Sequence, residues 1–164
     1  MLWLQGAQAQ QPAHVHGVLK LDVAVDVQTV TIGIDSPLDN IVGFERAPRT
    51  DAERKAAQQA VAQLRAADKL FDIDAAAGCK LSQVDLEAPS LSLGQAATPS
   101  AQGHAELEGS FIFECTRAVQ TRFIDLALFD VFRNVRQIDV QIVTPEGQYQ
   151  RTLKRPAKRL AWGK

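Results

Sequence analysis

Apolar and polar residues alternate along two neighbouring stretches near the start of the chain. Successive side chains of a strand point to opposite faces, so the alternation in residues 15–26 predicts a strand with one buried face. Residues 30–34 repeat the pattern, and the connection at 27–29 is short enough for a hairpin. The apolar positions of the pair are Val15, Leu19, Leu21, Val23, Val25, Val30, Ile32 and Ile34.

Further strands are predicted at residues 80–86, 104–115, 123–128, 137–143 and 148–153. The stretch 104–115 alternates again between an apolar face and a polar face. Its apolar face carries Leu107, Phe111, Phe113 and Cys115, and its polar face carries His104, Glu106, Glu108 and Glu114.

One long segment, residues 50–70, has the spacing of a helix instead. Thr50 and Glu53 form a capping-box pattern at its start, and small apolar residues recur at helical intervals behind them. Residues 35–48 are rich in turn formers but contain apolar side chains that should pack on the core. The order of strands, helix and strands predicts an α+β fold, mainly antiparallel β-sheet with one long helix packed on it.

Composition and charge argue against some classes of function. The 164 residues are 46% hydrophobic and carry a net charge of −1, which suits one compact domain over residues 10–164. A nucleic-acid-binding protein would need a basic face, and the only dense basic stretch, residues 151–159, is short and interrupted by Pro156. No run of about 20 apolar residues is present, so no membrane span is expected.

The first residues do not resemble part of the fold. Ala7-Gln8-Ala9 matches the small-x-small cleavage pattern of a secretory signal, although the positive and apolar regions of a complete signal are missing. We expect residues 1–9 to be the end of a signal peptide that starts upstream. An ordinary chain terminus is the alternative.

The chain has two cysteines, Cys79 and Cys115, which do not form a close pair in the sequence. In an oxidising compartment such an isolated pair is typical of one disulfide. Two buried free thiols in a cytosolic protein are the alternative that the sequence leaves open.

The three histidines suggest metal chemistry. His14 and His16 lie two apart at the start of the first predicted strand, and His104 and Glu106 lie two apart at the start of another. Residues two apart on a strand share a face, so neighbouring strands would gather imidazoles and a carboxylate, the ligands that zinc prefers. The alternative is a set of solvated histidines at strand ends.

Several short motifs occur together in a defined order, and with them the chain resembles the ZrgA-like family of zinc-regulated bacterial periplasmic proteins. The resemblance extends from about His14 to Trp162. The motifs are His14-Val15-His16-Gly17, Ser36-Pro37, Val42-Gly43-Phe44-Glu45, Ala77-Gly78-Cys79, Gly103-His104-Ala105-Glu106, Phe113-Glu114-Cys115, Leu128-Phe129 and Thr144-Pro145-Glu146-Gly147-Gln148.

The resemblance implies a periplasmic, non-enzymatic protein that binds Zn²⁺ and assists a zinc-import system. It places the family's histidine motifs at His14, His16 and His104 with Glu106, and its paired cysteines at Cys79 and Cys115. Two departures stand out. Arg46 occupies a position where family members often have histidine, and residues 88–103 lack the family's long histidine-rich insert. At most one compact metal site is therefore expected.

Glu45 is a further candidate ligand, because it follows an apolar segment that must fold back on the core. A surface ion pair with Arg46 or Arg49 is the alternative for this carboxylate. For the whole protein, two other functions remain open. One is a protein-interaction module that offers a sheet edge to a partner strand. The other is a zinc hydrolase, against which the sequence lacks a His-Glu-x-x-His helix and a nucleophile elbow.

Overall fold

The computed structural model describes residues 15–94 and 105–163. It confirms the predicted α+β class, because strands dominate and only short or medium-length helices accompany them. The strands in this part of the chain are β1 (Val18–Val25), β2 (Thr29–Pro37), β3 (Phe71–Ile73), β4 (Cys79–Glu87), β5 (Glu106–Cys115), β6 (Phe123–Leu126), β7 (Gln137–Thr144), β8 (Gly147–Lys154) and β9 (Arg159–Ala161).

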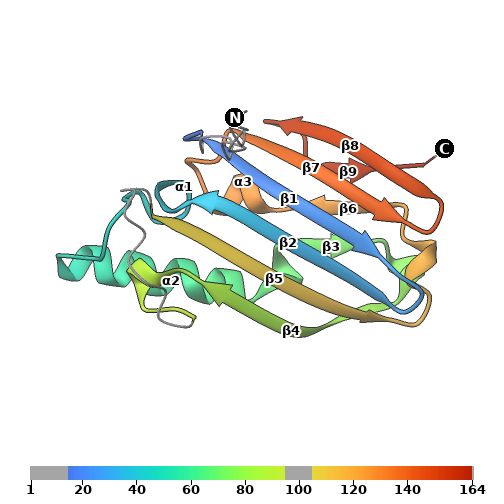
Figure 1. Cartoon of the computed structure of the whole chain (residues 1–164), viewed down its shortest axis with the longest axis horizontal. Coiled ribbons are helices and arrows are strands. Elements are labelled where there is room, and N and C mark those ends of the chain that lie inside the picture. Colours follow the sequence, from blue (N-terminus) through green and yellow to red (C-terminus); the bar gives the residue numbers. More distant parts are fainter. Residues whose placement is uncertain (1–14, 95–104, 164) are drawn as a thin grey trace, which may run out of the picture.

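The strands form two sheets (Figure 1). The large sheet has the order β4-β5-β2-β1-β7-β8, and the small sheet has the order β3-β6-β9. Every neighbouring pair is antiparallel except β1 and β7, which run parallel. The predicted hairpin of β1 and β2 is confirmed, and it forms the centre of the large sheet.

The helices accompany the small sheet on one face of the large sheet (Figure 1). Helix α2 begins with the predicted capping box but ends at Arg65, before the expected position near residue 70, and a short 3₁₀ turn follows it. The α-helices of the described residues are α1 (Leu38–Val42), α2 (Asp51–Arg65) and α3 (Leu128–Val131), and the 3₁₀ turns are η1 (Ala67–Lys69), η2 (Ala75–Ala77), η3 (Pro89–Leu91) and η4 (Ala118–Gln120).

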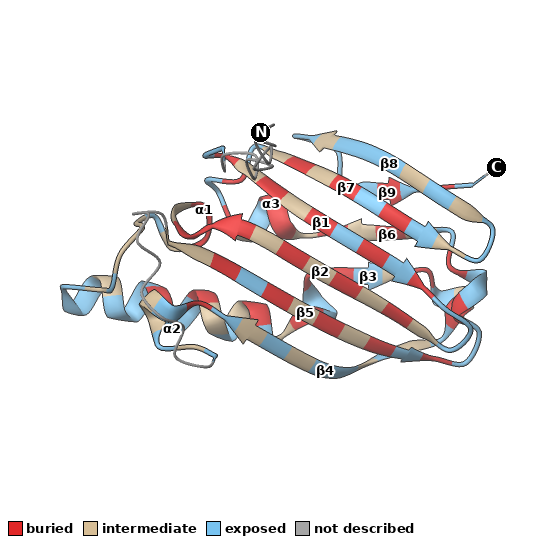
Figure 2. Ribbon diagram, in the orientation of Figure 1, coloured by how far each residue is buried: buried red, intermediate tan, exposed pale blue. Residues whose placement is uncertain are grey.

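The hydrophobic core lies between the large sheet and this second layer. Buried and more exposed positions alternate along the central strands, as Figure 2 shows for β1, β2 and β5. Helix α2 contributes Ala60 and Leu64 to the core, and α1 contributes Leu38 and Ile41. The segment 35–48 therefore packs on the core, as its apolar residues predicted, and it does so through a short helix.

Two predicted segments fall wholly or largely outside the described residues. These are the expected signal-peptide end at 1–9 and most of the loop expected at 88–103. None of the helices in the described ranges has the length and apolar character needed to cross a membrane.

Candidate metal centre

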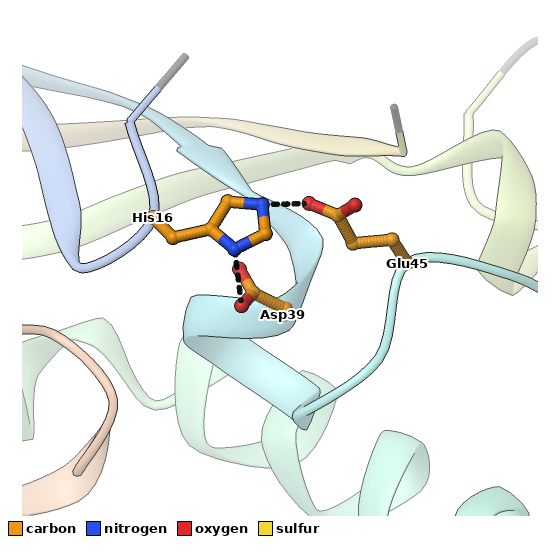
Figure 3. Close-up of side chains that lie close together, drawn as sticks. All are labelled: His16, Asp39 and Glu45. Carbon is orange, nitrogen blue, oxygen red and sulfur yellow. Dashed lines mark ion pairs between the residues drawn. The ribbon is translucent and has the colours of Figure 1, made fainter. Parts of the chain in front are cut away.

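Three ligand-type side chains meet where β1 begins and β2 ends. His16 lies in the turn before β1, Asp39 lies in α1, and Glu45 lies in the segment after α1 (Figure 3). The His16 ring lies between the two carboxylates. Its Nδ1 is 3.3 Å from Asp39 Oδ2, and its Nε2 is 2.9 Å from Glu45 Oε1. One potential ligand atom from each residue lies within 4.8 Å of the other two.

The hairpin register explains why His16 and Asp39 come together. Lys20 pairs with Asp35 in the β1–β2 ladder. Continuing this antiparallel register past the ends of both strands brings His16 opposite Asp39. The two residues are therefore neighbours because they flank the same end of one hairpin.

His16 itself is not on a strand, which corrects the prediction of a strand over residues 15–26. The chain turns before β1, with the Val18 amide donating to the Val15 carbonyl at 3.0 Å. Gly17 has a positive φ of 85°, a conformation that glycine adopts readily and other residues rarely do. His16 consequently does not share a strand face with another ligand candidate in the way that the sequence pattern predicted.

The segment that carries Glu45 is attached to the start of α2. Arg46 donates two hydrogen bonds to the Glu53 carboxylate, at 2.9 and 2.7 Å, and the Arg49 amide donates a third at 2.6 Å. The hydrogen bonds from Arg46, together with that from the Arg49 amide, lower the pKa of Glu53 to about 2. Arg46 thus pairs with Glu53, while Glu45 faces His16.

The donor set suits a divalent cation. It offers one imidazole nitrogen and carboxylate oxygens, which zinc accepts as ligands. Asp39 Oδ1 is buried and has no hydrogen-bond partner in the part of the chain that the structure describes. Buried polar atoms normally have a partner, and a bound cation would supply one. The side chain of His16 is 54% exposed and those of Asp39 and Glu45 are 25% and 22% exposed, so an ion can enter from solvent.

The distances between the potential ligand atoms are also close to those between two ligands of one bound ion. Two ligand atoms that each lie about 2 Å from one zinc ion are at most about 4 Å apart. The three potential ligand atoms lie within 4.8 Å of one another, so binding one ion would require the carboxylates to approach and the His16 ring to turn until a single nitrogen faces the ion. The imidazole of His16 occupies the space between the two carboxylates.

The structure brings some of the sequence-predicted residues together and not others. His16 and Glu45 belong to the cluster, whereas Glu106 begins β5 opposite Pro37 and is not one of its three members. His14 and His104 lie outside the described residues. Asp39 is not among the residues predicted from the sequence, although the register of the hairpin indicates it once His16 is considered.

The cysteines form a disulfide. Cys79 and Cys115 are directly opposite in the β4–β5 ladder, and their sulfur atoms are bonded. The structure thereby confirms the predicted pairing.

The fold and the cluster together define a two-layer α+β protein with a candidate cation site at one end of its large sheet. The chain belongs to the ZrgA family of zinc uptake proteins, whose family model matches residues 13–162. A search of curated proteins finds no match.

Proposed function

We propose that this protein is a periplasmic zinc-binding accessory protein that contributes to zinc acquisition or buffering, and that His16, Asp39 and Glu45 hold the ion. One observation carries the proposal. A histidine and two carboxylates from three different segments have potential ligand atoms within 4.8 Å of one another. The family's zinc-uptake description agrees with this donor set. Binding and delivery, with a zinc-import component as partner, are the proposed role, without a catalytic step.

The charge balance supports a divalent ion at this position. Two carboxylates and a neutral imidazole carry two negative charges, which one Zn²⁺ would neutralise. Carboxylates held close together repel each other unless a cation lies between them. Zinc would replace the imidazole as the group between Asp39 and Glu45, with one ring nitrogen of His16 as a ligand.

We include His104, Glu106 and His14 as candidates for the remaining coordination position. The Leu38 amide, directly before Asp39, donates to the Ala105 carbonyl at 2.8 Å. His104 directly precedes Ala105 in the sequence. His14 is two residues from His16. These assignments rest on chain connectivity and the sequence motifs.

The proposal is tested by zinc affinity, measured by competition with a fluorescent chelator. We expect one zinc ion per chain, and we expect His16→Ala, Asp39→Asn and Glu45→Gln each to lower the affinity at least about tenfold, because each removes a ligand. Lys20→Gln is the matched control, since Lys20 lies on β1 and pairs with Asp35 outside the cluster. If all three variants bind zinc as tightly as the wild type, this cluster is not the site.

The fourth ligand is identified by the same chelator competition. His104→Ala, Glu106→Gln and His14→Ala are compared with the wild type, and a ligand is identified by a loss similar to that of His16→Ala. If none of the three lowers the affinity, a water molecule completes the coordination and the three-residue site stands alone.

A further inference from the structure

The side chain of Asn40 connects the segments that carry two of the proposed ligands. Its Oδ1 accepts a hydrogen bond from the Gly17 amide at 2.7 Å, and its Nδ2 donates to the Val18 carbonyl at 2.9 Å. Nδ2 also donates to the Ser36 hydroxyl at 3.1 Å. Asn40 is 2% exposed and Ser36 is fully buried. A buried amide with these three partners is a specific connection and not an incidental contact.

Because of Pro37, the hairpin lacks one backbone hydrogen-bond donor next to the Asn40 side chain. In an antiparallel ladder, every second opposing pair exchanges two hydrogen bonds. Asp26 and Thr29 form one of these hydrogen-bonded pairs, because the Asp26 amide donates to the Thr29 carbonyl at 2.9 Å. Continuing the register puts Val18 and Pro37 in such a pair, but proline has no amide hydrogen to donate. Asn40 Nδ2 supplies the missing donor to the Val18 carbonyl.

The other side of the same turn is held by the chain before β7. The Gly17 carbonyl accepts hydrogen bonds from the amides of Arg136 and Gln137, at 2.8 and 3.0 Å. Gly17 is therefore fixed through both its amide and its carbonyl. His16 directly precedes Gly17 and Asp39 directly precedes Asn40, so the hydrogen bond from the Gly17 amide to the Asn40 side chain links the segments of two proposed ligands.

From this geometry we propose that Asn40 is a positioning residue of the metal centre. It holds the His16 turn at a fixed distance from Asp39 before any ion is bound. The inference rests on the proposed zinc site and adds a residue that does not touch the ion. Residues that orient metal ligands in this way typically alter metal affinity about 10–100-fold when replaced.

The test measures zinc affinity of the oxidised protein by chelator competition, at a temperature well below unfolding. We expect Asn40→Ala to lower zinc affinity about 10–100-fold while the protein remains folded. Asn40→Leu is the second variant, because it keeps the branched shape of asparagine and fills the same space without hydrogen bonds. It should show the same loss of affinity.

A stability control separates positioning from general destabilisation. Ile124→Val shortens a fully buried side chain of β6 in the small sheet. This variant should lower the melting temperature but bind zinc like the wild type. If the Asn40 variants are folded and bind zinc within twofold of the wild type, the positioning role is overturned while the zinc site stands. If the wild type itself binds no zinc, the proposed function fails first and this inference falls with it.

Discussion

Each of the three proposed ligands is followed directly by a residue that anchors its segment. Gly17 follows His16 and is held by hydrogen bonds on both sides, and Asn40 follows Asp39 and makes three hydrogen bonds. Arg46 follows Glu45 and donates twice to Glu53. A surface ion pair between mobile side chains would not need such support. Anchored ligands are what a site with a defined geometry requires.

A substitution at Gly17 tests this anchoring at the scale of one residue. Gly17 has φ of 85°, and a Cβ atom there would lie 2.5 Å from Arg136 Nε. We predict that Gly17→Ala destabilises the fold by about 1–2 kcal/mol from backbone strain and also weakens zinc binding, as measured by urea unfolding and chelator competition.

Gly33→Ala is the matched control for this prediction. Gly33 lies in β2 with no positive φ, and a Cβ atom added there would lie 3.7 Å from its nearest neighbour, in ordinary contact. It should change stability and zinc affinity little. Equal behaviour of the two alanine variants would contradict a specific requirement for glycine before β1.

Two members of the candidate cluster, His16 and Glu45, were predicted from the sequence, and the third, Asp39, was not. His16 and Glu45 could be chosen because imidazole and carboxylate are recognisable ligands and their segments border the core. Asp39 could not be chosen from alternation, since it lies in a short helix within a turn-rich segment. Only the pairing register of the hairpin, a long-range property, brings it opposite His16.

At the scale of elements, the start of α2 anchors the segment that carries Glu45 as well as the helix itself. Glu53 completes the capping box with Thr50 and also accepts the hydrogen bonds of Arg46. The ordinary pKa of a glutamate is 4.5, and that of Glu53 is lowered to about 2. A lowered pKa means that the carboxylate form is favoured by folding, so its stabilising effect is complete above pH 4.5 and is lost as the pH falls towards 2.

We therefore predict a pH-dependent effect of Glu53→Gln on the free energy of unfolding. The variant should be less stable than the wild type above about pH 5, and the difference should shrink between pH 4.5 and 2 as Glu53 of the wild type becomes protonated. Urea unfolding at a series of pH values measures both curves.

Repeating the Glu53→Gln comparison in an Arg46→Gln variant tests whether Arg46 causes the lowered pKa of Glu53. Arg46 is the largest contributor to the lowered pKa of Glu53, so in this background Glu53→Gln should have a smaller effect and a weaker pH dependence. A pH-dependent difference of the same size in both backgrounds would show that the backbone hydrogen bonds at the start of α2, and not Arg46, account for the lowered pKa of Glu53.

The elements themselves were predictable to different degrees. Strands with several alternating residues, such as β1, β2 and β5, were found from the sequence because burial of one face imposes that pattern. β3 and β9 have three residues each, too few to show alternation. The parallel pairing of β1 with β7 joins segments far apart in the sequence, and no local pattern encodes it.

At the scale of the molecule, the candidate metal centre and the disulfide lie towards opposite ends of β5. Glu106 begins this strand opposite Pro37, beside α1, and Cys115 ends it. Ten residues of strand extend roughly 30 Å. The large sheet thus separates the disulfide at one end from the candidate binding site at the other, so removing the disulfide should lower stability without changing zinc affinity.

The disulfide variant Cys79→Ser/Cys115→Ser tests this separation. Cys79 and Cys115 are 36 residues apart in the sequence, so the chain-entropy model predicts a loss of roughly 3–4 kcal/mol in the free energy of unfolding. Zinc affinity of the folded variant should equal that of the wild type. A large loss of zinc affinity in a folded variant would show that the two ends of the sheet are coupled.

The most direct test of the central claim is the position of the zinc ion in a crystal of the zinc-loaded protein. Diffraction data collected on both sides of the zinc absorption edge should show one anomalous peak between His16, Asp39 and Glu45. Its distances to a ring nitrogen and to carboxylate oxygens should be about 2.0–2.2 Å. A zinc peak elsewhere with this cluster unchanged, or no peak from protein that was loaded with zinc, would contradict the account.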